Sequence, residues 1–166
     1  MRTLLVSGGA IALIAGMALA VDGPMKDGLW SIHMVNTITS PGNATPKTTD
    51  VAISRCQDKS VPLQIPGDPP KGGECKVISR SSNGSTRFVE FQCAQNGRTT
   101  RVKETVAMKG EDEGHAITDS TFDPPMNGIS GMRLVADFKY LGICPAGVKP
   151  GDVVGPDGKV INPPKR

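Results

Sequence analysis

The stretch MRLVADFKY, residues 132–140, decides the fold class, because apolar and polar side chains alternate along it. Its apolar positions are Met132, Leu134, Ala136, Phe138 and Tyr140, and Arg133, Asp137 and Lys139 lie between them. A period of two is typical of a β-strand that buries one face. We therefore expect an extended strand here and not a helix.

Further strand patterns precede this one. In residues 30–38 the even positions are mostly apolar, and His33 falls on the wetter face. Shorter strand patterns cover residues 50–56, 76–79, 87–91, 98–108 and 115–122. Turn-forming residues separate them, and no amphipathic helical segment longer than two turns is visible. The sequence therefore predicts a mostly β fold, an antiparallel meander sheet of about seven strands that is curved or barrel-like.

Four cysteines, Cys56, Cys75, Cys93 and Cys144, make up the whole cysteine content. An even number of cysteines predicts a disulfide framework if the chain enters an oxidising compartment, and three pairings are possible. A zinc site would need closely spaced pairs such as C-x-x-C, which are missing from this sequence. Two disulfides are therefore favoured over a metal.

A hairpin centred on Gly84 selects one pairing. Asn83-Gly84 is a typical tight-turn dipeptide, and Cys75 and Cys93 are equidistant from Gly84. The two cysteines should therefore face each other on neighbouring strands. We expect a Cys75–Cys93 disulfide, which leaves Cys56 to pair with Cys144.

The N-terminal residues resemble a bacterial secretory signal. One basic residue precedes an uncharged run from Leu4 to Leu19, which closes with Ala18-Leu19-Ala20. A retained membrane anchor is the alternative, but the run is short for a span and contains three glycines. We expect residues 1–20 to be a signal peptide, residues 21–144 a β domain, and residues 145–166 a mostly irregular tail rich in Pro and Gly. The mature protein would be periplasmic or secreted and would not span the membrane.

Composition argues against nucleic-acid binding. The formal net charge is +3, and the chain contains one Trp, one Tyr and four Phe. Nucleic-acid binding would favour a basic face with aromatic stacking residues, so we expect no nucleic-acid partner.

Catalytic and metal-binding patterns are weak. His33 and His115 are the two histidines, and no G-x-S-x-G nucleophile motif occurs. Glu111, Asp112 and Glu113 with His115 could gather a divalent cation, but a charged hairpin tip is the favoured explanation. We expect no catalytic residue, no metal and no cofactor, and therefore no enzyme.

Several short motifs together resemble a known family. They are Asp27-Gly28-Leu29-Trp30, the lone Cys56, the Cys75 to Cys93 hairpin, and Tyr140-Leu141-Gly142-Ile143-Cys144-Pro145. In this order they resemble a family of small secreted proteobacterial proteins that is catalogued as a domain of unknown function. The resemblance implies export, a β-rich domain and disulfides, and it supplies no activity or catalytic residue.

Two functional hypotheses remain. The first is a non-catalytic binding module in which one sheet face holds a small apolar or envelope-derived ligand, lined by Trp30, Ile32, Met34, Phe138 and Tyr140. The same residues could instead form a filled core. The second is a protein-interaction or inhibitor module acting on an envelope enzyme, with residues 62–70, rich in proline, as the candidate contact.

Overall fold

The computed structural model describes residues 26–43, 45–58, 74–155 and 157–161. The predicted signal peptide, its cleavage point and the proline-rich residues 62–70 lie outside these ranges. The described ranges form nine strands. They are β1 (Gly28–Thr39), β2 (Lys47–Gln57), β3 (Glu74–Asn83), β4 (Thr86–Gln95), β5 (Arg98–Lys109), β6 (Glu113–Met126), β7 (Ile129–Gly142), β8 (Val153–Val154) and β9 (Val160–Ile161).

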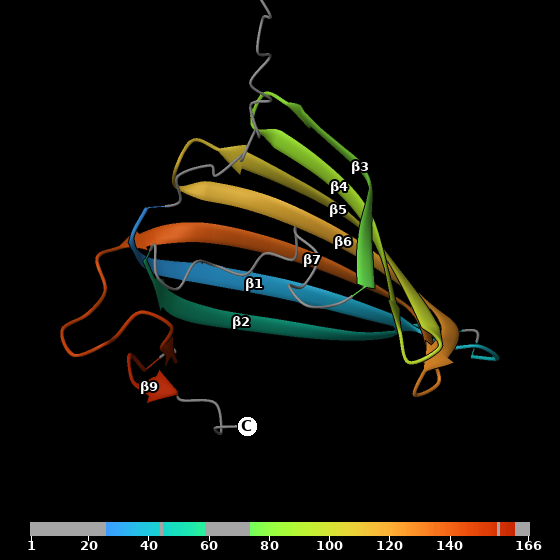
Figure 1. Ribbon diagram of the computed structural model, residues 1–166. Coiled ribbons are helices and arrows are strands. Elements are labelled where there is room, and N and C mark those ends of the chain that lie inside the picture. Colours follow the sequence, from blue (N-terminus) through green and yellow to red (C-terminus); the bar gives the residue numbers. More distant parts are fainter. Residues whose placement is uncertain (1–25, 44, 59–73, 156, 162–166) are drawn as a thin grey trace, which may run out of the picture.

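All nine strands belong to one antiparallel sheet in the order β3-β4-β5-β6-β7-β1-β2-β8-β9. The sheet is curved but open, and β3 and β9 form its two edges (Figure 1). The predicted antiparallel meander with two disulfides is therefore confirmed, and closure into a barrel is not observed. The count exceeds the predicted seven because the tail contributes β8 and β9, which extend the sheet beyond β2.

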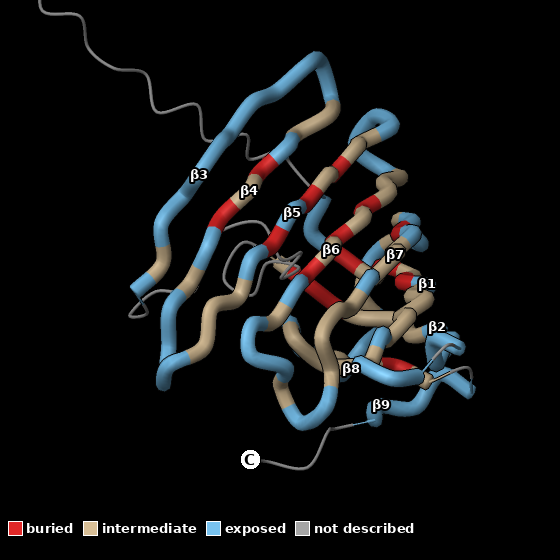
Figure 2. The backbone as a smooth tube through the Cα atoms, turned by 90° about the vertical axis from the view of Figure 1, so that its right-hand side faces the viewer, coloured by how far each residue is buried: buried red, intermediate tan, exposed pale blue. Residues whose placement is uncertain are grey.

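The pairing register divides the side chains of the sheet between two faces. Residues that pair across an antiparallel ladder point to the same side, so Ile32, Phe138 and Ile53 share one face. We call this side the inner face, because most of the buried core residues lie on it. Figure 2 shows buried stretches alternating with exposed ones along the central strands. His33, Asp137 and His115 pair on the opposite side, which we call the outer face.

The core of the inner face consists of two apolar clusters. The first contains Trp30, Ile32, Val106, Ala116 and Phe138, and the second contains Val89, Phe91 and Val102. Every member is less than one tenth exposed. The alternation seen in residues 30–38 and 132–140 therefore identifies the buried face correctly.

Glycines permit two close approaches in the first cluster. The ring of Phe138 lies where a Cβ on Gly114 would stand, and the two residues pair in register. Gly28 has a φ of 147°, and its missing Cβ leaves room for the carbonyl oxygen of Gly142. A larger residue at either position would displace an aromatic ring or a backbone group.

Some boundaries differ from the sequence-based expectation. The second strand begins at Lys47 instead of near Asp50. The 84–85 turn joins β3 to β4, with a positive φ of 59° at Gly84 and none at Asn83, so Gly84 takes the first central position of the turn. β6 continues through Pro124 and Pro125 to Met126, beyond the expected end at residue 122, although its pairing with β7 is interrupted between Thr121 and Met126.

Within the described ranges, no helix is long and apolar enough to cross a membrane.

Candidate functional site on the inner face

The five residues predicted to line a ligand site do come together on the inner face. β1 and β7 are neighbours, and their register pairs Trp30 with Tyr140 and Ile32 with Phe138. Met34 pairs with Ala136 in the same ladder and packs against the first apolar cluster. The alternation of the two strands was sufficient to place all five on one face.

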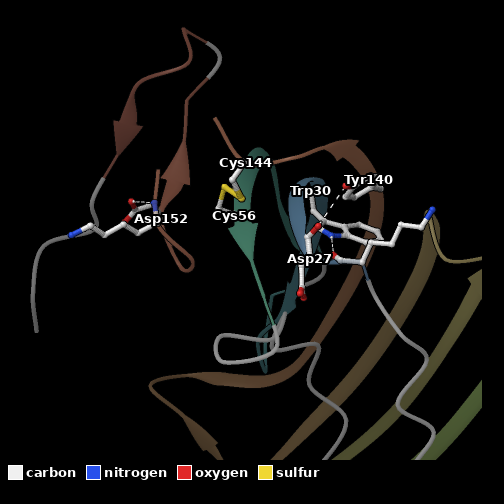
Figure 3. Close-up of a disulfide and its surroundings, with 8 residues drawn as sticks. Asp27, Trp30, Cys56, Tyr140, Cys144 and Asp152 are labelled. Carbon is white, nitrogen blue, oxygen red and sulfur yellow. Dashed lines mark hydrogen bonds between the residues drawn. A yellow bond between two sulfur atoms is a disulfide. The ribbon is translucent and has the colours of Figure 1, made fainter. Parts of the chain in front are cut away.

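Trp30 is the centre of this group. Its side chain is fully buried, and its ring centroid lies 5.5 Å from that of Tyr140 and 6.3 Å from that of Phe138. The indole Nε1 donates a hydrogen bond of 2.9 Å to the carbonyl oxygen of Lys26, and the hydroxyl of Tyr140 donates to the carbonyl oxygen of Asp27 at 3.4 Å (Figure 3). Trp30 is therefore a packed core residue with a satisfied polar atom.

A polar cluster of Arg87, Glu104 and Thr118 lies on the same face. Glu104 is 3% exposed, and it projects from β5 between Val102 and Val106, which belong to the two different apolar clusters. Arg87 Nη2 lies 3.4 Å from Glu104 Oε1, and Thr118 Oγ1 donates to Glu104 Oε2 at 3.4 Å. Sequence reasoning missed this cluster.

The burial of Glu104 calls for a functional explanation. Taking a carboxylate out of water costs several kcal/mol even when a partner is present, and an apolar residue at this position would avoid that cost. Among the described residues, Glu104 is the buried group that carries a formal charge. Sites for small molecules commonly have an apolar lining with a few placed polar groups, and the inner face has this composition.

The two histidines lie away from this cluster, on the outer face. His33 Nε2 lies 2.7 Å from an Asp50 carboxylate oxygen, and His115 Nδ1 lies 2.7 Å from one of Asp137. All four side chains are substantially exposed. The pairs are surface contacts of modest energy and are not joined to a nucleophile by any hydrogen bond that the structure describes.

The acidic turn after β5 forms a network with lysines. Lys26 Nζ lies 2.7 Å from an oxygen of Asp112, and this hydrogen bond raises the pKa of Lys26. Glu113 contacts Lys139 at 3.3 Å and Lys109 at 3.6 Å, and the hydrogen bond from Lys139 is the main reason why the pKa of Glu113 is lowered. In the described part of the chain, no three His, Cys, Asp or Glu residues are arranged to hold a metal ion.

The two disulfides have the predicted pairing. Cys75 is bonded to Cys93 across a directly paired position of the hairpin, and Cys56 is bonded to Cys144. Cys56 also exchanges backbone hydrogen bonds with the tail, accepting one from Gly151 at 2.8 Å and donating one to Asp152 at 3.0 Å. The second disulfide therefore lies at the point where the tail joins the sheet, and Cys56 pairs with Leu29, the chain neighbour of Trp30 (Figure 3).

A family model described as "Protein of unknown function (DUF3617)" matches residues 25–144. The chain belongs to this family. The DUF3617 region spans β1 to β7 and includes all four cysteines, whereas β8 and β9 follow it. The motifs that suggested the resemblance meet in space, because Leu29 pairs with Gly142 and Gly28 packs against the carbonyl of the same glycine.

Other comparisons add little to the family assignment. No curated protein matches the chain. One solved structure that matches, the ywiB protein from Bacillus subtilis, is 5% identical, with 70% of this chain and 94% of that chain covered, at a TM-score of 0.29.

Proposed function

We propose that this DUF3617 domain is a non-catalytic binding module whose inner face holds a small apolar or envelope-derived ligand. The observation that supports the proposal most strongly is the buried Glu104 among the apolar residues of that face. Trp30, Ile32, Met34, Phe138 and Tyr140 would provide the apolar contacts. Glu104 with Arg87 and Thr118 would orient a polar group of the ligand.

A fluorescence titration tests this function. Trp30 is the single tryptophan, and its buried ring should emit at short wavelength in the native state. Adding an apolar dye or short acyl chains should change its emission saturably. Met34→Asp should weaken this response because it introduces a charge into the apolar lining. Divalent metal and chelator should have no effect.

The neighbouring residue Val35 provides a matched control. It lies on the same strand as Met34 but on the outer face, where it pairs with Val135. Val35→Asp should leave the titration unchanged once thermal melting shows that both variants are folded. If no ligand of this kind alters Trp30 emission, the inner face is a filled core and the binding function is wrong.

We also propose that the protein is exported to the periplasm or secreted. The two disulfides and the signal-like residues 1–20 support this location. The intact mass of protein recovered from a periplasmic fraction should correspond to a chain beginning at Val21. A mass that includes residues 1–20 would contradict cleavage at this point.

A protein-interaction or inhibitor role on an envelope enzyme is the second candidate. One observation favours it: apolar side chains are exposed near the β3 edge, with Val77 at 39%, Ile78 at 44% and Phe88 at 43%. Exposed apolar groups near an unpaired strand edge are a common site of protein association. This function takes precedence if the titration of the inner face gives no response.

A further inference from the structure

Charged residues are distributed unequally between the two faces of the sheet. By the register of β1 to β7 and the alternation along each strand, one acidic residue, Glu104, lies on the inner face. The basic residues of this face are Lys47, Arg55, Arg80, Arg87 and Arg98. The inner face is therefore both apolar and net positive.

The outer face has a balanced set of charges. Its acidic residues are Asp50, Glu74, Glu90, Glu113, Asp119, Asp123 and Asp137. Many of them are paired: Arg133 Nη1 contacts both carboxylate oxygens of Asp119 at 2.9 Å, and Glu90 contacts Arg101 at 2.5 Å. The positive charge on the inner face therefore does not reflect a general lack of acidic residues in the sheet.

Two inner-face arginines have a buried donor that no described residue accepts a hydrogen bond from. The Nε atoms of Arg55 and Arg98 are inaccessible to solvent and have no hydrogen-bond partner among the described residues. A buried donor that lacks a partner costs about 1–3 kcal/mol. An anion would remove that cost once a rotation of the half-buried side chain exposes Nε to it, and guanidinium groups bind carboxylate and phosphate groups particularly well.

We infer that the ligand of the inner face is an anionic amphiphile, a molecule with an apolar chain and a carboxylate or phosphate head group. This inference rests on the proposed binding function and specifies its ligand. The apolar clusters would hold the chain, and Arg55 or Arg98 would bind the head group. Arg55 pairs in register with Trp30, so a head group at Arg55 would lie close to the fluorescent reporter.

Four probes with unbranched alkyl chains of eleven or twelve carbons test the inference below their critical micelle concentrations. Dodecanoate and dodecyl phosphate carry negative head groups, dodecanol is neutral, and dodecyltrimethylammonium is positive. We expect at least one anion to bind about tenfold more tightly than dodecanol, because a charge-assisted hydrogen bond contributes more than a neutral one. The cation should bind more weakly than dodecanol. The comparison of the two anions identifies the preferred head group.

Arginine variants test which residues bind the head group. Arg55→Gln and Arg98→Gln should retain the fold, because the buried Nε that each substitution removes has no hydrogen-bond partner among the described residues. At least one of them should reduce the advantage of the anion over dodecanol to about twofold or less. Arg133→Gln is the matched control on the outer face, and it should leave the advantage unchanged. Melting curves of all three variants report whether they are folded.

The possible failures can be distinguished. If all four probes bind with similar affinity, the binding function stands but the anionic ligand is wrong. If the anion is preferred and neither arginine variant changes this preference, the assignment of the head group to Arg55 or Arg98 is wrong. If no probe binds, the proposed function itself fails.

Discussion

Replacing both Cys56 and Cys144 by alanine should lower the free energy of unfolding by about 4.5 kcal/mol. The disulfide joins residues 88 apart in sequence, and a cross-link that closes a long loop removes much of the entropy of the unfolded chain. Domains of this size are typically stable by about 5–15 kcal/mol, so the loss amounts to roughly a third to nine tenths of the stability. Urea unfolding, followed by circular dichroism, measures the change.

The hairpin disulfide is the matched control. Cys75 and Cys93 are 18 residues apart. The same relation between loop length and entropy predicts that replacing both by alanine lowers the free energy of unfolding by about 3 kcal/mol. Alanine is preferable to serine because Cys56 is fully buried, and a buried hydroxyl would add its own cost. A larger loss from the hairpin pair than from the Cys56–Cys144 pair would contradict loop length as the main determinant.

The fold could be predicted from the sequence because one face of each long strand is buried. A shift of one residue in the pairing register would move every side chain of a strand to the opposite face. The alternation in residues 30–38 and 132–140 therefore constrains which face of each strand is buried. The disulfide pairing was predicted from the position of Gly84 midway between Cys75 and Cys93, and the pairing is observed. The turn itself is centred between Gly84 and Ser85, and a register shift between Val77 and Ser79 brings the two cysteines directly opposite each other.

The short strands of the tail were not predicted. Val153 and Val154 are two residues between glycines and prolines, which is too little for a period to be visible. They form a strand because the Cys56–Cys144 disulfide and the backbone bonds at Cys56 hold the tail against β2. Tertiary contacts therefore determine the structure of this segment.

The polar cluster of Arg87, Glu104 and Thr118 had one indication in the sequence. Along residues 98–108, Val102, Val106 and Met108 mark the buried phase, and Glu104 occupies the same phase. A charged residue at an apolar position of a strand is an indication of a buried polar site. Its partners could not be found in this way, because Arg87 and Thr118 come from other strands.

Replacing Trp30 by alanine is expected to cost about 3–5 kcal/mol of stability, as large-to-small changes of buried aromatic residues do. The side chain is fully buried and its ring contacts those of Phe138 and Tyr140, so alanine leaves a cavity in the first apolar cluster. The hydrogen bond from Nε1 to the Lys26 carbonyl is also lost, although Lys26 is exposed and its carbonyl can bind water instead. Urea unfolding of the disulfide-bonded protein gives the value.

Two control variants separate packing from hydrogen bonding at Trp30. Trp30→Phe keeps an aromatic ring and loses the indole donor, so it should cost less than Trp30→Ala. Tyr140→Phe removes only the 3.4 Å bond to Asp27 and should change stability by no more than about 1 kcal/mol. A loss of under 1 kcal/mol for Trp30→Ala would mean that the cluster around this ring contributes little to stability.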